Sequence, residues 1–294
     1  MSRPKFIIEV RVNEYMGREK SPHVPFTPEE IAEDVAECVR QGASIIHYHA
    51  RDPKTNAPST DAEVCAEIER QIRKRCDVIT MPTLGAHIVQ SEGRIAHILE
   101  MAKDPMTRPD CVPIDVVTTN MAMYNSATGD FERDDRTYEN SIADLKRLCQ
   151  GVKSVGVKPI AMLWNVASIR VTEVLQKLGF FDDPLYCEVV LFSGKTLGFG
   201  HPGTIRGMHS MLDFFPAHSN WHWSAHSHDN TLGIAAGAIE AGGHATLGLG
   251  DYHYPELGLP TNGQLVAYVA TMARAMGREV ATVAEARQML GMPR

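Results

Sequence analysis

Short apolar runs alternate along this chain with longer segments whose apolar positions recur every three or four residues. Residues 5–12 (KFIIEVRV) are short and rich in β-branched side chains, which predicts a strand. Residues 26–42 follow the helical period, and Thr27 with Glu30 predicts a capping box at the start of this helix. Residues 43–49 (ASIIHYH) predict a second strand. The first fifty residues therefore predict one β-α-β unit.

The same alternation continues to the end of the chain. The predicted strands are 5–12, 43–49, 77–83, 112–120, 158–165, 186–193, 220–227 and 244–251. The predicted helices are 26–42, 60–76 (with a capping box at Thr60 and Glu63), 91–104, 137–156, 167–179, 204–215, 230–243 and 262–277, followed by an extra C-terminal helix at 282–291. Eight β-α repeats in a chain of this length predict an α/β fold, a (β/α)₈ TIM barrel with an extra C-terminal helix.

The chain lacks signs of a division into domains or of a nucleotide-binding Rossmann fold. No Gly-, Pro- or Ser-rich linker interrupts the repeats, so we expect residues 1–294 to form a single TIM-barrel domain. No G-x-G-x-x-G sequence follows the first predicted strand, which disfavours a doubly wound dinucleotide-binding sheet.

Composition narrows the classes of function. The net charge is −7, so we expect no nucleic-acid partner and no anionic membrane surface. No run of residues approaches the ~20 apolar positions that a transmembrane helix needs, and the N-terminus lacks the apolar core of a signal peptide. The six cysteines form no C-x-x-C pair, which disfavours a zinc ribbon and suits reduced thiols in the cytoplasm.

Two histidines stand at the end of the second predicted strand, in the stretch SIIHYHARD. A strand alternates its side chains, so His47 and His49 point to the same face. Two imidazoles on one face suit a metal ion, although an H-x-H pair is also compatible with two hydrogen-bonded side chains at a strand end.

The active site of a TIM barrel lies at the carboxyl ends of its strands, and polar residues gather at those positions. They are Glu14, His47, His49, Thr83, Thr119, Asn120, Asn165, His226, His228 and Asp251. Ordinary hydrogen bonding explains single members such as Thr119 or Asn165 equally well. Several histidines and carboxylates at one mouth are costly to bury unless they are paired or functional, which favours a metal site.

The chain resembles the β-keto acid cleavage enzymes, whose first-described member is 3-keto-5-aminohexanoate cleavage enzyme. The resemblance rests on the ordered segments PFTPEEIAE, HYHARDPKTNAPS, AGGHATLGLGD and PTNGQLVAYVATMARAMGREVATVAEARQML. It implies a zinc-dependent (Zn²⁺) barrel, in a homotetramer, that exchanges an acyl group between a β-keto acid and acetyl-CoA. The products would be acetoacetate and a new acyl-CoA.

Carried over by position, the resemblance assigns roles to several residues. His47 and His49 match the two zinc-binding histidines of the family, and Asp251 matches the acidic residue credited with proton transfer. Glu14 falls where the founding enzyme has a glutamate at its substrate site. We expect substrate to contact the following residues: Thr83, Gly85, Thr119, Asn120, Asn165, His226 and His228.

Four departures from the family pattern change the expected pocket. The third zinc ligand, a glutamate in the family, is Gly250 here, and the arginine that pairs with the aspartate is Thr246. The S-T-G-G motif after the third strand reads PTLG at 82–85. An acidic pair on the fifth strand reads Ile160 and Met162, which predicts a neutral or apolar acyl tail in preference to a cationic one.

These departures lead to a specific expectation for the metal and for the base. The first strand lies between the second and the eighth in a barrel, so we expect Glu14 to complete the ligand set with His47 and His49. Asp251 competes for that place, but its use as a ligand would remove the base. We expect His226 and His228 to contact substrate or to replace the missing arginine.

The anionic CoA arm needs local cations or hydrogen-bond donors to bind its phosphate groups. The candidates that would donate to the phosphates are Lys195, Arg206 and the backbone of residues 198–203, although solvated surface charge explains each cation alone.

Two other classes of protein compete with acyl exchange as the function of the chain. One alternative is a metal-dependent hydrolase of the amidohydrolase type, which carries H-x-H on strand one rather than strand two. Another is a barrel that binds a metal or metabolite without turning it over.

Overall fold

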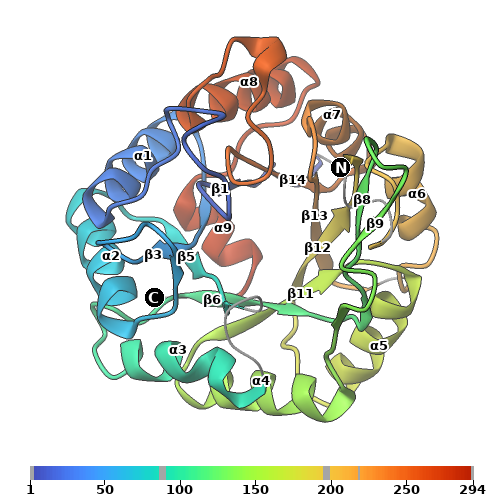
Figure 1. The fold of residues 1–294 in the computed structure, drawn as a ribbon, viewed down its shortest axis with the longest axis horizontal. Helices are drawn as coiled ribbons and strands as arrows, with labels where there is room; N and C mark the ends of the chain where they lie inside the picture. Colours follow the sequence, from blue (N-terminus) through green and yellow to red (C-terminus); the bar gives the residue numbers. More distant parts are fainter. Residues whose placement is uncertain (1–2, 86–90, 195–198, 218, 293–294) are drawn as a thin grey trace.

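Eight parallel strands form one sheet that curls into a barrel (Figure 1). The computed structural model describes residues 3–85, 91–194, 199–217 and 219–292. The sheet order is β5-β2-β1-β14-β13-β12-β11-β6. The strands are β1 Ile8–Arg11, β2 Ile45–Tyr48, β5 Ile79–Pro82, β6 Cys111–Asp115, β11 Lys158–Leu163, β12 Leu185–Leu191, β13 Trp221–Ser227 and β14 His244–Leu247. The backbone nitrogen of Asp110 donates to the oxygen of Thr80 at 3.2 Å, which joins the two ends of this order.

Helices surround the barrel and follow its strands as predicted (Figure 1). They are α1 Pro28–Gln41, α2 Ala62–Arg75, α3 Ala96–Met101, α4 Ile142–Ser154, α5 Val166–Lys177, α6 Ile205–Leu212, α7 Leu232–Ala241, α8 Asn262–Ala275 and α9 Val283–Met289. The predicted capping box of the first helix is confirmed, because Thr27 accepts from the backbone of Glu30 and the Glu30 side chain accepts from the backbone of Thr27. The predicted TIM barrel with an extra C-terminal helix is therefore confirmed.

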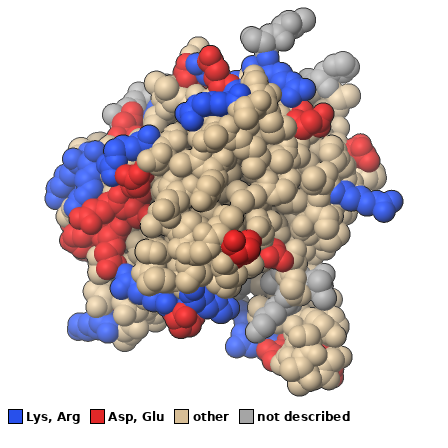
Figure 2. All heavy atoms as spheres, turned by 90° about the horizontal axis from the view of Figure 1, so that it is seen from above, with Lys and Arg blue, Asp and Glu red and all other residues tan. Residues whose placement is uncertain are grey.

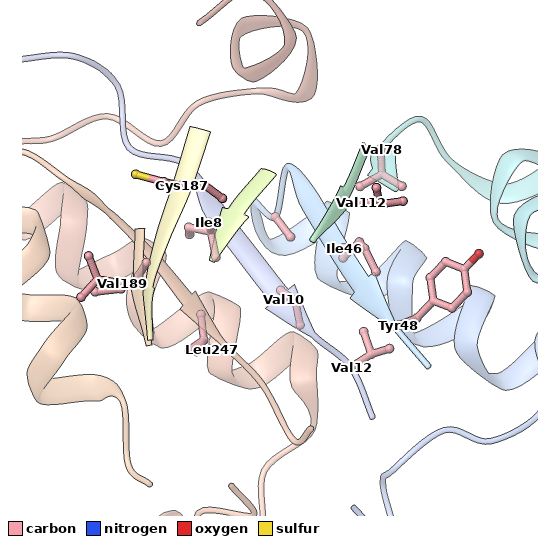
Figure 3. Packing of buried hydrophobic residues seen from close by; sticks show 14 of the residues in the cluster. Ile8, Val10, Val12, Ile46, Tyr48, Val78, Val112, Cys187, Val189 and Leu247 are labelled. Carbon is pink, nitrogen blue, oxygen red and sulfur yellow. The ribbon is translucent and has the colours of Figure 1, made fainter. Parts of the chain in front are cut away.

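Alternate residues of each strand pack outward against the helices. Ile8 and Val10 of β1, with Ile46 and Tyr48 of β2, belong to the main buried apolar cluster (Figure 3). The residues between them on β1, Glu9 and Arg11, lie on the other face of the strand and are also buried. The barrel interior thus receives charged side chains from the first strand.

Helix α9 closes the amino-terminal end of the barrel. Ala286 and Leu290 pack with Ile7, Ile45 and Ile79, which stand at the starts of the strands. Polar contacts hold the same face: Arg287 donates to Asp110 at 2.5 Å, and Lys158 donates to the backbone oxygen of Leu290 at 2.6 Å. The extra helix therefore forms a floor beneath the barrel, opposite the strand ends that carry the candidate chemistry.

An arm of residues 116–140 connects β6 to α4. It contains the paired strands β7 Thr119–Asn120 and β10 Thr137–Tyr138, and the hairpin strands β8 Met123–Asn125 and β9 Asp130–Glu132 (Figure 1). The predicted strand 112–120 was therefore too long, and the predicted helix at 137–156 starts instead at Ile142. A smaller pair, β3 Ala50–Arg51 with β4 Pro58–Ser59, follows β2.

Two other predicted helix starts were wrong. Helix α2 is capped by Asp61, whose side chain accepts from the backbone of Glu63 and Val64, and not by Thr60. The predicted helix at 91–104 begins as a 3₁₀ helix, η1 Ser91–Ile95, before α3. A second short 3₁₀ helix, η3 Pro255–Leu257, precedes α8.

Within the described part of the chain, no helix combines the length and the apolar character needed to cross a membrane. On the face drawn in Figure 2, charges of both signs lie mainly toward the edges around a broad uncharged area.

Candidate active site at the carboxyl ends of the strands

The pairing of β1 with β2 brings Glu14 beside the two histidines. Arg11 stands opposite His47 in the register, and the chain that follows β1 runs past His49. The Asn13 side chain fixes this approach, because its Oδ1 accepts from the backbone nitrogen of His49 and its Nδ2 donates to the backbone oxygen of His49, both at 2.9 Å. Asn13 thus sets the position of Glu14 relative to His49.

Glu14, His47 and His49 converge on one point as a buried triad. Nε2 of His47 lies 3.1 Å from Oε1 of Glu14, and Nε2 of His49 lies 2.7 Å from Oε2. The two Nε2 atoms are only 3.1 Å apart. Nδ1 of His47 lies 2.8 Å from the backbone oxygen of Met81, a partner that can only accept, so Nδ1 carries the proton and Nε2 presents a lone pair. These donor atoms fit a divalent cation with nitrogen and oxygen ligands.

Burial and charge keep His49 and Glu14 in the protonation states that a metal site requires. Burial lowers the pKa of His49 to about 4, so its imidazole is neutral near pH 7. Burial opposes ionisation of Glu14, but Arg11 and the two histidines hold its pKa well below the usual value. A neutral His49 and an ionised Glu14 are in the forms that bind a metal ion at neutral pH.

The backbone at Glu14 is in a conformation that non-glycine residues rarely adopt. Its φ is +35°, in the left-handed region. The Arg51 guanidinium donates to the backbone oxygens of Glu14 and Met16 and thereby holds this turn. Such outliers cost about 1–3 kcal/mol and concentrate at functional sites, which agrees with a role for Glu14.

Arg11 lies at the centre of the buried carboxylates, and our sequence analysis did not identify it. Its guanidinium contacts Glu14 directly, with Nη1 3.4 Å from Glu188 and Nε 3.4 Å from Asp251. Burial opposes its positive charge, but these three carboxylates raise its pKa above the usual value. Arg11 therefore lies beside Asp251, a position that it shares with His228.

Asp251 and the two later histidines form a second group, in which His226 and Asp251 are buried and His228 is partly exposed. Nδ1 of His228 lies 3.4 Å from Oδ1 of Asp251, and Nδ1 of His226 lies 3.2 Å from Oε2 of Glu188. Burial raises the pKa of the Asp251 carboxyl, and Arg11 and His226 oppose this shift. The donor atoms of His226, His228 and Asp251 are also close enough to hold a cation.

A cavity of about 600 Å³ opens at this end of the barrel. Among the residues that the sequence analysis singled out, Glu14, His47, His49, Thr83 and His228 line it. Among the described residues, the lining does not include His226 or Asp251, which lie beneath Arg11 and His228, nor Gly85, Thr119, Asn120 or Asn165.

The residues outside the lining have structural contacts of their own. Asn165 caps α5 by accepting from the backbone of Ser168 at 2.9 Å. Thr119 and Asn120 form β7, and the backbone nitrogen of Gly85 donates to Thr83 at 3.1 Å. A role for them in substrate binding stays a prediction.

The predicted phosphate donors lie away from the triad or beyond the described residues. Arg206 is exposed in the first turn of α6, and Lys195 lies outside the described residues. A separate cavity of about 630 Å³ lies at the opposite end of the barrel, near Lys158 and Met292. It contains none of the histidines discussed above.

Comparison with known proteins decides between the alternatives. A model of the beta-keto acid cleavage enzyme family matches residues 5–292. The chain belongs to this family. It is therefore an enzyme of the acyltransferase type, as the resemblance predicted, and neither an amidohydrolase-type barrel nor a non-catalytic one.

Several curated relatives of this family member cover nearly its whole length. It is 30% identical to a 3-keto-5-aminohexanoate cleavage enzyme of Fusobacterium nucleatum, over 94% of this chain and 93% of the relative. It is 27% identical to a 3-dehydrocarnitine:acetyl-CoA trimethylamine transferase of Rhizobium meliloti, over 92% and 91%. It is also 27% identical to a 3-oxoadipate:acetyl-CoA acetyltransferase of Cupriavidus necator, over 98% and 95%.

Solved structures support the fold alone. The apo structure of ObcA superposes with a TM-score of 0.68 at 17% identity, covering 92% of this chain and 66% of that one. A type I 3-dehydroquinate dehydratase from Clostridium difficile gives a TM-score of 0.55 at 11% identity, covering 94% of each chain.

Proposed function

We propose that this β-keto acid cleavage enzyme exchanges an acyl group between a β-keto acid and acetyl-CoA. Three relatives are named for reactions with acetyl-CoA or for cleavage of a keto acid, which supports this reaction for the present chain. The observation that carries the proposal is the buried convergence of Glu14, His47 and His49 on one point of the cavity wall.

Zn²⁺ is the proposed metal, and Glu14, His47 and His49 are its proposed ligands. Three protein ligands of nitrogen and oxygen type, with room for a further ligand from the cavity, suit a catalytic zinc site. When bound, the ion supplies a Lewis acid that polarises the keto oxygen of the substrate and stabilises enolate charge. The Met81 carbonyl orients His47, and Asn13 positions the backbone of His49.

Asp251 is the proposed base. Its carboxylate oxygens are buried and accept no hydrogen bond from the described residues, and Arg11 and His228 each lie 3.4 Å from one of them. His228 lines the cavity and contacts Asp251, which gives the proton a path between substrate and carboxylate. A raised pKa makes Asp251 a better proton acceptor than an ordinary aspartate.

The proposed reaction balances without a further reagent. The base takes a proton from C2 of the β-keto acid, C2 attacks the thioester carbonyl of acetyl-CoA, and the CoA thiolate departs. The thiolate then attacks the original ketone carbon, and the bond between that carbon and C2 breaks. The proton held by Asp251 returns to C2, so the products are acetoacetate and a new acyl-CoA.

The cellular setting is part of the same proposal. All six cysteines are free thiols, which supports a reducing compartment, and we place the enzyme in the cytoplasm. The family resemblance supports a homotetramer, which light scattering on the purified protein would test.

The decisive experiment is an acceptor screen. Zinc-loaded protein is incubated with acetyl-CoA and a panel of β-keto acids, and new acyl-CoA and acetoacetate are measured by mass spectrometry. We expect matched formation of both products from at least one acid, and formation slower by about 10²-fold or more with Asp251→Asn. Absence of products from every acid, with the metal site filled, would overturn the proposed function.

A further inference from the structure

The cavity at the mouth of the barrel has a polar side and an aromatic side. In the sheet order, β11 and β12 are separated from β1 and β2 by the intervening strands and lie across the ring (Figure 1). The triad side presents Glu14, His47 and His49, whereas the opposite side presents Trp164 and Phe192. A substrate held by its keto acid group at the triad would therefore extend its acyl tail toward the aromatic side.

The aromatic side is a packed wall. The rings of Trp164 and Phe192 lie 4.9 Å apart, and the rings of Phe192 and Phe199 lie 5.6 Å apart. Met162 and Val190, one position earlier on the inward faces of β11 and β12, complete the wall. These side chains offer apolar surface and no hydrogen-bonding group to a ligand, apart from the indole nitrogen of Trp164.

The indole nitrogen of Trp164 already has a hydrogen-bond partner. Nε1 of Trp164 donates to Oδ1 of Asp115 at 3.1 Å, and the Tyr138 hydroxyl donates to Oδ2 at 2.5 Å. The Arg94 guanidinium lies 3.5 Å from the same carboxylate and donates to Asn140 at 2.5 Å. The Trp164 ring is thus fixed in orientation, and the Asp115 charge is balanced by Arg94.

The charge of the cavity argues against a cationic tail. The carboxylates among its lining residues are Glu14, Glu19 and Asp115, whereas the cations are Arg11, Lys20, Arg94, Arg133 and Arg136. The two carboxylates away from the rim, Glu14 and Asp115, already contact arginines. A charged tail of either sign would lose water against the uncharged rings of Trp164 and Phe192, where Asp115 and Arg94 already contact each other.

We propose that Trp164, Phe192, Met162 and Val190 form an acyl-tail subsite for an uncharged, branched or aromatic substituent of the β-keto acid. This inference rests on the proposed function, because it assumes that the keto acid group binds at the triad. Asp115 acts as a positioning residue that fixes the Trp164 ring. The subsite distinguishes this enzyme from relatives named for 3-keto-5-aminohexanoate, 3-dehydrocarnitine and 3-oxoadipate, whose tails are charged.

Binding in the absence of acetyl-CoA tests the subsite separately from the reaction. Zinc-loaded protein is titrated calorimetrically with 5-methyl-3-oxohexanoate, in which a methyl group replaces the ammonium group of 5-amino-3-oxohexanoate. The charged acid itself, 3-oxoadipate and 3-dehydrocarnitine are titrated in parallel. We expect 5-methyl-3-oxohexanoate, the acid with an uncharged tail, to bind at least about tenfold more tightly than each acid with a charged tail.

Variants assign the effect to the wall. Trp164→Ala and Phe192→Leu should each weaken binding of the uncharged acid by about fivefold or more while changing that of 3-oxoadipate by less than about twofold. Trp221→Phe is the matched control, since Trp221 donates to Gln176 outside the cavity, and it should leave binding unchanged. Circular dichroism checks that each variant is folded, and Phe192→Leu serves if Trp164→Ala is not.

The possible results distinguish a failure of the acyl-tail subsite from a failure of the proposed reaction. Equal or tighter binding of any charged acid overturns the subsite, and tighter binding of 3-dehydrocarnitine would show instead that the rings recognise a quaternary ammonium group. Unchanged binding in both wall variants also overturns it. If the uncharged acid binds as expected but acetyl-CoA gives no products with any acid, the subsite stands and the proposed reaction fails.

Discussion

The side chain of Glu14 occupies the space beside Gly250. A Cβ atom at position 250 would lie 2.6 Å from Cγ of Glu14 and 2.8 Å from the backbone oxygen of Arg11, both too close for real contacts. The backbone nitrogen of Gly250 also donates to that oxygen at 2.9 Å. Any side chain at 250 would therefore displace Glu14 from its present position next to the histidines.

Gly250→Ala is expected to lower metal affinity even though it touches no proposed ligand atom. The new methyl group displaces Glu14 from His47 and His49, and we expect zinc affinity to fall by about 10- to 100-fold. Competition with a chromophoric chelator measures the affinity directly. The control is Gly233→Ala in α7, where an added Cβ meets no atom within 4 Å. Equal zinc affinity in the two variants would contradict this steric relationship.

Glu14→Gln and Asp251→Asn should separate the ligand from the base. We expect Glu14→Gln to lose zinc, because the amide is a poorer ligand than the carboxylate at 2.7 Å from His49. Asp251→Asn should keep zinc and lose turnover by about 10²-fold or more. Metal content after dialysis and the rate of acyl-CoA formation are the two measurements. The reverse pattern would make Asp251 the ligand and remove it as the base.

Arg11→Gln is expected to destabilise the metal-free protein by about 3–5 kcal/mol. The substitution leaves Glu14, Glu188 and Asp251 buried without the cation that contacts all three. Arg11→Lys keeps the positive charge but not the planar guanidinium, so we expect a smaller loss in the free energy of unfolding. Urea unfolding gives the free energy of unfolding of each variant. A loss below about 1 kcal/mol for Arg11→Gln would show that the three carboxylates do not depend on it.

Glu69 should make the stability of the protein depend on pH. Burial raises the pKa of this carboxyl to about 7, although Arg73 opposes the shift. Between the ordinary value near 4.3 and about 7, the folded protein therefore retains a proton that the unfolded chain has released, and the free energy of unfolding falls as pH rises. At pH 8 we expect Glu69→Gln to recover about 2–4 kcal/mol, since glutamine still accepts from Tyr48.

Urea unfolding at pH 5 and pH 8 tests this dependence. The difference between the two pH values should shrink in Glu69→Gln. It should persist in Glu63→Gln, which removes an exposed carboxylate from the first turn of the same helix. A pH dependence that is unchanged in Glu69→Gln would assign it to another group.

The sequence predicted the features that depend on local pattern. Thr27 and Glu30 cap α1 because the capping box needs only residues three apart. His47 and His49 share a face because a strand alternates its side chains, and Glu14 lies beside them because the first two strands are neighbours in the barrel. Each of these follows from spacing and from the order of strands.

The sequence did not predict which of several neighbouring residues would cap a helix or contact a buried carboxylate. Asp61 caps α2 in place of Thr60, because its carboxylate reaches two backbone N–H groups. Arg11 contacts Asp251 together with His228, and only the tertiary structure shows that the Arg11 guanidinium reaches across from β1. A signal was present, since Glu9 and Arg11 alternate as charged residues in an otherwise apolar strand, which is the pattern of side chains directed into the barrel.

The floor formed by α9 has a consequence for the order in which the molecule is assembled. Ile7, Ile45 and Ile79 are among the first parts of the chain to be synthesised, yet they are covered by Ala286 and Leu290, which are among the last. A nascent chain can therefore stack its repeats in order while the base of the barrel stays open to water. A chain that lacks α9 would therefore leave these isoleucines exposed at the base of the barrel.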